Sequence, residues 1–116
     1  PMATWCTNCR AQLGDVRIAR DRVNTDEFVF IALSLETYLT ASDLADYAER
    51  QGFDWTFAVM SDELLQELTG TFGRALASAP STPHFIIRPD GAFTELATGH
   101  ESAAQIVEEL TAASGA

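Results

Sequence analysis

The chain has 116 residues, a length typical of one domain, so we expect residues 1–116 to fold as a single unit. Its 17 acidic residues outnumber seven basic ones, all arginine, and the net charge of −10 argues against nucleic acid or an anionic membrane surface as a partner. No apolar run approaches the ~20 residues that cross a bilayer. The segment Pro1–Cys6 has neither the basic nor the apolar region of a signal peptide.

In the first half of the chain, helical and strand patterns alternate. A helix is predicted from Cys6, or just after it, to about Arg22. The continuous apolar run 28–33 is typical of a strand that is covered on both faces. A capping box that begins at Thr40 then predicts a helix over 41–51.

The second half continues the alternation, and the whole order indicates an α/β fold. The predicted elements are a short strand at 57–59, a helix capped by Ser61, an irregular crossover over 70–81, a hairpin with arms 85–87 and 92–96, and a final helix over 102–113. The hairpin turn is predicted at Pro89-Asp90-Gly91.

The two cysteines of the chain carry its clearest chemical signal. Cys6-Thr7-Asn8-Cys9 lies at a predicted helix start, where free backbone N–H groups and the helix dipole stabilise a thiolate. Cys9 falls one turn further along and is expected to be the more buried sulfur. The spacing therefore predicts dithiol–disulfide exchange in which Cys6 attacks and Cys9 resolves the mixed disulfide.

Other interpretations of the pair remain open. A structural zinc site needs four ligands, and the chain adds only His84 and His100 to the two cysteines. An inert disulfide or two buried thiols would also suit this spacing. The alternative function is a copper-binding metallochaperone that uses Cys6, Cys9 and His84 as soft ligands. A thiol peroxidase and a redox-inert docking module are weaker alternatives.

The segment Ala3–Arg10 resembles the active-site segment of thioredoxin-like proteins, in particular the extracytoplasmic TlpA/ResA group linked to cytochrome c maturation. Thr82-Pro83, the following apolar residues and the final amphipathic helix are similar to later parts of that family. The resemblance covers nearly the whole chain. It implies a thioredoxin-like three-layer sandwich, in which helices flank a central mixed sheet.

The resemblance also implies roles for further residues. Thr82-Pro83 would be a cis bond beside the cysteines, and the backbone of Thr82 would pair with the substrate chain by strand addition. Trp5 would line the same groove, although ordinary packing of this ring is an equal alternative. The expected partners are protein thiols and disulfides, including an upstream electron donor. The protein would act as an extracytoplasmic monomer and would need no cofactor and no metal beyond the redox-active pair.

The chain departs from the family in two respects. Thr7-Asn8 between the cysteines adds no positive charge, which predicts a mild reductant, and His84 is a weaker candidate for tuning the thiolate. The family strand that precedes the Trp-Cys motif is missing from this sequence, so the chain is N-terminally incomplete relative to the family. Glu36 follows the first strand, and its simplest interpretation is a solvated loop carboxylate.

Overall fold

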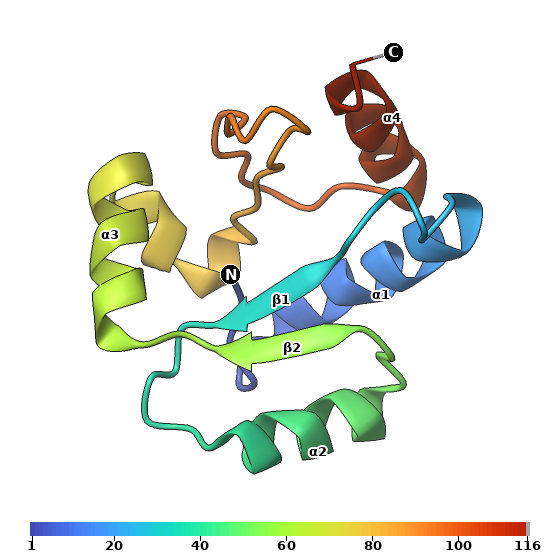
Figure 1. The fold of residues 1–116 in the computed structure, drawn as a ribbon. Coiled ribbons are helices and arrows are strands. Elements are labelled where there is room, and N and C mark those ends of the chain that lie inside the picture. Colours follow the sequence, from blue (N-terminus) through green and yellow to red (C-terminus); the bar gives the residue numbers. More distant parts are fainter. Residues whose placement is uncertain (116) are drawn as a thin grey trace.

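The computed structural model describes residues 1–115, in which four helices surround two parallel strands (Figure 1). The helices are α1 (Thr7–Arg22), α2 (Ala41–Gln51), α3 (Asp62–Phe72) and α4 (Ala103–Ala113). The strands are β1 (Ile31–Ser34) and β2 (Thr56–Val59), and two short 3-10 helices, η1 (Arg74–Ala77) and η2 (Ala79–Ser81), follow α3. The α/β class predicted from the sequence is confirmed.

The sheet brings the start of α1 to the carboxyl ends of its strands. β1 and β2 pair in parallel, and α2 connects them and lies along β2 (Figure 1). On the opposite edge of β1, Met2 makes one parallel bridge with Ser34. Its N–H donates to the Leu33 carbonyl and its carbonyl accepts from the Leu35 N–H, both at 2.8 Å. Because Ser34 ends β1, the segment that leads to Cys6 leaves this edge where ligands usually bind in parallel sheets.

Local signals set the bounds of α2, as predicted. The Thr40 hydroxyl accepts the Asp43 N–H at 3.0 Å, and the Asp43 carboxylate accepts the Thr40 N–H at 3.3 Å. Gly52 ends the helix with a φ of 74°, a conformation that residues with a Cβ rarely adopt. Both ends of α2 are therefore fixed by residues within a few positions along the chain.

The strand predicted over 28–33 is shorter than expected, and its two-sided burial is wrong. β1 begins only at Ile31, which lies opposite the first residue of β2, Thr56, so residues 28–30 have no partner strand. Val29 is 80% exposed and Ile31 is also exposed, whereas Ala32 and Ser34 are buried. The burial alternates because only one face of β1 meets the core.

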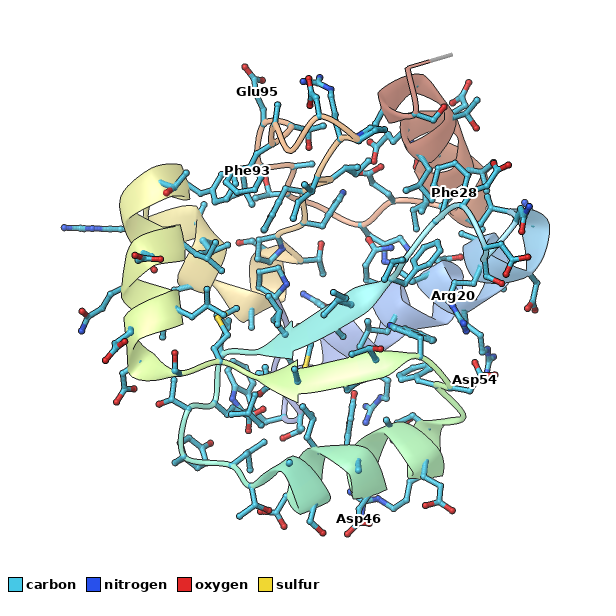
Figure 2. The ribbon with its side chains drawn as sticks, viewed as in Figure 1. Arg20, Phe28, Asp46, Asp54, Phe93 and Glu95 are labelled. Carbon is cyan, nitrogen blue, oxygen red and sulfur yellow. The ribbon has the colours of Figure 1, made fainter. Side chains whose placement is uncertain are left out.

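Arg20 ties the end of α1 to the amino-terminal side of the sheet. Its guanidinium lies 2.7 Å from the Asp54 carboxylate, and Figure 2 shows the two side chains beside each other. The same group lies over the rings of Phe30 and Trp55, 5.8 and 5.3 Å from their centroids. These contacts orient α1 along the sheet, with the cysteine segment at its other end.

The expected mixed central sheet does not form in residues 1–115. The sheet there has two parallel strands, and the segments 85–87 and 92–96 are joined by one isolated antiparallel bridge, Ile87–Phe93, with a second, His84–Ala97, just beyond them. The predicted turn is present, since the Gly91 N–H donates to the Arg88 carbonyl at 2.9 Å. However, the Ile86 N–H donates to the Thr94 hydroxyl at 2.8 Å instead of to a backbone carbonyl. This side chain interrupts the ladder, so the two arms remain an irregular hairpin.

Packing extends α3 beyond the point where the sequence predicted irregular chain. The helix continues through Gly70 to Phe72. The Phe72 ring lies 4.5 Å from that of Phe85 and 5.8 Å from that of Phe93, which Figure 2 shows on the hairpin facing α3. These aromatic contacts stabilise the last turn, and the irregular crossover is limited to residues 73–82 with their two 3-10 turns.

The cis bond expected at Thr82-Pro83 is absent, because every peptide bond between residues 1 and 115 is trans. Thr82 instead adopts a left-handed conformation, with φ 47° and ψ 56°, which is uncommon for a β-branched residue. Its N–H donates to the Ala79 carbonyl at 2.9 Å and closes η2. The chain therefore makes a tight turn that ends at Thr82.

The buried core lies between α1, the sheet and α2, and it contains both cysteines. Its other members include Met2, Ala3, Leu13, Ala32, Leu44, Tyr47, Ala48, Phe53 and Ala79. The cysteine pair is thus part of the main core and not of a surface loop. Among the described helices, none combines the length and the apolar character that a membrane span requires.

Candidate functional site

Cys6 is the N-cap of α1. Its backbone is extended (φ −88°, ψ 111°), and its sulfur accepts the Cys9 N–H at 3.1 Å. A serine or aspartate oxygen usually makes this contact, so here the sulfur replaces the common capping atom. The Cys6 sulfur thus lies at the free N–H groups and the positive end of the helix dipole.

Cys9 is held in the opposite way, as a protonated thiol. It donates to the Ala79 carbonyl oxygen at 3.2 Å. Burial, and after it the adjacent Cys6 thiol, raise the pKa of Cys9 to about 12. Both cysteines are free thiols and almost fully buried, with 3% and 2% exposed for Cys6 and Cys9. Exposure therefore does not distinguish the two, contrary to our expectation, but their hydrogen-bond partners do.

The start of α1 is joined to η2, about 70 residues later in the chain. Besides the contact between Cys9 and Ala79, the Asn8 side-chain amide donates to the Pro80 carbonyl at 3.0 Å. Thr7 is exposed and adds no contact to this junction. The two residues between the cysteines therefore differ in role, because Asn8 links the helix to the crossover while Thr7 faces solvent.

The residues expected to form a substrate groove lie around this junction. Trp5 is 63% exposed and directly precedes the N-cap cysteine. Thr82 and Pro83 follow η2 and are both buried. The Thr82 N–H is bonded to Ala79 and its carbonyl accepts from the His84 ring at 2.9 Å. Pairing of a substrate strand with the Thr82 N–H would require its bond to Ala79 to open, whereas the Thr82 carbonyl can still accept a second hydrogen bond.

Glu36 is a buried carboxylate that organises the approach to the cysteines, and not the solvated side chain that the sequence suggested. Only 6% of the residue is exposed. It accepts hydrogen bonds from both the backbone N–H and the hydroxyl of Thr4, the latter at 2.8 Å. The hydroxyls of Ser34 and Tyr38 donate to it as well, each at 3.2 Å. The position just after β1 was the only sequence signal for this role.

Tyr47 is a residue of the site region that the sequence analysis missed. It lies on the buried face of α2 in the same core as the cysteines, and its hydroxyl is buried without a hydrogen-bond partner. Burial raises the pKa of Tyr47, and the thiols Cys9 and Cys6 act in the same direction. The spacing Leu44, Tyr47, Ala48 on one helix face was the available signal.

His84 has partners other than the cysteines. Nδ1 bonds to the Thr82 carbonyl, and Nε2 contacts the carboxylate of Glu101 and lies 3.8 Å from that of Glu109. Burial, followed by contact with Glu101, raises the pKa of Glu109 to about 7. Both ring nitrogens of His84 are therefore occupied, so a copper site shared with Cys6 and Cys9 would require these contacts to break.

The raised pKa predicts slow alkylation of Cys9. In a Cys6→Ser variant, which leaves Cys9 as the single cysteine, burial still raises the pKa of Cys9, so only a very small fraction of the thiol is ionised at pH 8. We expect iodoacetamide to react at least about 100-fold more slowly than with an ordinary cysteine, because the thiolate is the nucleophile. The rate should rise about tenfold per pH unit toward pH 12, as followed by intact mass.

The same variant unfolded in urea is the control for this measurement. Its Cys9 should alkylate with the pH dependence of a free thiol, with a midpoint near about 8.5. Equal rates in the folded and unfolded protein at pH 8 would show that the fold does not protect the Cys9 proton.

The chain matches no family model, and it has no significant match among curated proteins or among solved structures.

Proposed function

We propose that this protein is a thiol–disulfide oxidoreductase that exchanges electrons with protein partners through Cys6 and Cys9. The observation that carries the proposal is the unequal treatment of the two sulfurs. The Cys6 sulfur accepts an N–H at the start of α1, whereas the Cys9 thiol donates to a carbonyl and keeps its proton. In this proposal Cys6 attacks first, and Cys9 keeps its proton until Cys6 has reacted.

The reaction can be written with all atoms and electrons in balance. The Cys6 thiolate attacks one sulfur of a substrate disulfide, which forms a mixed disulfide and releases one substrate thiolate. Cys9 then attacks the Cys6 sulfur, its proton passing to the departing second substrate thiolate. The products are a Cys6–Cys9 disulfide and a reduced substrate, and two electrons have moved to the substrate. A dithiol protein, as upstream electron donor, would return the pair to the thiol form.

The resemblance to thioredoxin-like proteins supports this proposal and extends it. The helix that starts at the cysteines, the β1–α2–β2 unit and the terminal α4 follow the family's order of elements. We therefore propose a thioredoxin-like ancestry, an extracytoplasmic location and action as a mild reductant, with Trp5 beside the reacting sulfur. The trans Thr82-Pro83 bond and the two-stranded sheet are the features that depart from this comparison.

A redox titration tests the function. The protein would be equilibrated across graded ratios of reduced to oxidised dithiothreitol or glutathione, and its free thiols would be alkylated under unfolding conditions and counted by mass. We expect one reversible two-electron transition between about −300 and −120 mV, closer to the reducing end. Unfolding before alkylation is needed because Cys9 is protected in the folded state.

One result would contradict the exchange function, and a second would contradict only the proposed role as a reductant. Thiols that stay free at every ratio would mean that the pair cannot form a disulfide. A midpoint near about −120 mV would leave the exchange function standing but would make the protein an oxidant.

A further inference from the structure

A second group of chemically active side chains lies outside the cysteine site. His84 at the base of the hairpin, Glu101 just before α4 and Glu109 within α4 each direct one potential metal-binding atom to the same point, and these atoms lie within 4.8 Å of one another. The first and last of these residues are 25 positions apart, so only the fold brings them together. Nothing in the cysteine chemistry requires this arrangement.

A hydrogen bond at Nδ1 sets the orientation of the His84 ring. The Thr82 carbonyl can only accept, so Nδ1 must carry the proton that it shares with that oxygen at 2.9 Å. Nε2 then points toward the carboxylates of Glu101 and Glu109. Metal-binding histidines are commonly held in this way, with the second ring nitrogen donating to a backbone carbonyl.

Hydrogen bonds hold the Glu101 backbone in place, but one oxygen of its carboxylate has no partner. The Gln12 side chain clamps its backbone on both sides, since Gln12 Oε1 accepts the Glu101 N–H at 2.7 Å and Gln12 Nε2 donates to the Glu101 carbonyl at 2.9 Å. Its side chain is only 13% exposed, and Oε2 has no hydrogen-bond partner. A proton on His84 Nε2 would satisfy only Oε1 and would leave this second oxygen unpaired.

We propose that His84, Glu101 and Glu109 form a binding site for a divalent first-row metal ion of the zinc type. A proton shared by His84 Nε2 and Glu101 Oε1 still leaves Glu101 Oε2 without a partner and Glu109 nearby, whereas a divalent cation in place of that proton would neutralise both carboxylates. One imidazole nitrogen with two carboxylate oxygens is a ligand set for Zn²⁺ or Mn²⁺, and not for copper(I), which prefers sulfur.

The geometry needs a small rearrangement to hold such an ion. Metal–ligand distances of about 2.0–2.2 Å place ligand atoms about 3–3.5 Å apart. His84 Nε2 and Glu101 Oε1, which are in direct contact, would separate slightly, and Glu109, 3.8 Å from Nε2, would move closer. Glu109 can supply this movement, because its side chain is 42% exposed and sits on the solvent side of the group. The same opening leaves at least one coordination position for water.

Metal titration tests this site in a Cys6→Ser, Cys9→Ser double variant, so that no thiol competes for the ion. Isothermal titration with Zn²⁺ at pH 7.5 should give one equivalent bound, and the melting temperature should rise with the ion concentration because the ion binds the folded state. Since this background lacks both cysteines, the result is independent of the proposed exchange activity.

A pair of neighbouring glutamates provides matched variants. Glu109→Gln should weaken the affinity for Zn²⁺ at least about tenfold, as loss of a ligand does, and His84→Ala should do the same. Glu108→Gln removes the same charge from an exposed position on the same helix and should leave the affinity unchanged. Absence of saturable binding by the double variant, or equal loss in Glu108→Gln and Glu109→Gln, would overturn the site.

Discussion

Replacement of Cys6 by serine is expected to lower the rate of disulfide exchange to the uncatalysed background, a loss of at least about 1,000-fold, because a hydroxyl cannot replace the thiolate nucleophile. The substitution should leave the fold intact. Serine is among the preferred N-cap residues, and its oxygen can accept the Cys9 N–H that the sulfur now accepts at 3.1 Å. The loss therefore reports on chemistry and not on the start of α1.

Replacement of Cys9 by serine should give a different result, because this thiol acts only in the second step. The serine hydroxyl can still donate to the Ala79 carbonyl, so the site remains closed. We expect Cys6 to attack a disulfide substrate and then to remain attached to it, since no resolving thiol follows. Non-reducing electrophoresis and intact mass would show a stable mixed disulfide with Cys9→Ser and none with Cys6→Ser.

The two single variants are controls for each other, and their melting temperatures establish that both are folded. A mixed disulfide that accumulates on Cys9 in the Cys6→Ser variant would reverse the assigned roles. Full exchange activity in either variant would show that the pair does not act as a unit.

The elements that the sequence predicted well are those whose signals are local. Thr40, Asp43 and Gly52 fix α2 through contacts at most four residues apart, and Cys6 begins α1 in the same way. The strand at 28–33 was predicted too long because its apolar content says nothing about where a partner strand begins, and β2 begins only opposite Ile31. Composition indicated a strand, but pairing decided its length.

In the candidate site too, contacts between residues far apart in the sequence could not be predicted. The cysteine pair was found because its members are three residues apart, whereas Glu36 was assigned to solvent because its partner Thr4 lies 32 residues away. Nothing in the sequence connects Glu101 and Glu109 to His84, because the three side chains come together only in the folded chain. The cis bond at Thr82-Pro83 was predicted from a resemblance, but the bond is trans, and Thr82 adopts a left-handed conformation with its N–H bonded to the Ala79 carbonyl.

Among these substitutions, removal of the Glu36 carboxylate should cause the largest fall in the free energy of unfolding. Glu36→Ala leaves the Thr4 N–H and the hydroxyls of Thr4 and Ser34 without their acceptor in a largely buried region. We expect a loss of ~2–4 kcal/mol in the free energy of unfolding, since each unsatisfied buried donor costs about 1–3 kcal/mol and some will find water. Thermal and urea unfolding would measure it, with a fall in Tm of about 10 °C or more.

Two control variants distinguish loss of the Glu36 hydrogen bonds from loss of one negative charge. Glu95→Ala removes a carboxylate from the exposed hairpin, where Figure 2 shows it directed away from the protein, and should change stability by no more than about 0.5 kcal/mol. Glu36→Gln keeps one acceptor oxygen, and its stability should lie between those of Glu36→Ala and Glu95→Ala.

Exchange activity should also depend on Glu36. Since Thr4 is two residues before Cys6, a disordered Thr4 would loosen the N-cap, so activity should be lower in Glu36→Gln and lowest in Glu36→Ala. Equal stability of Glu36→Ala and Glu95→Ala would mean that the segment before Cys6 is held by its bridge to β1 alone.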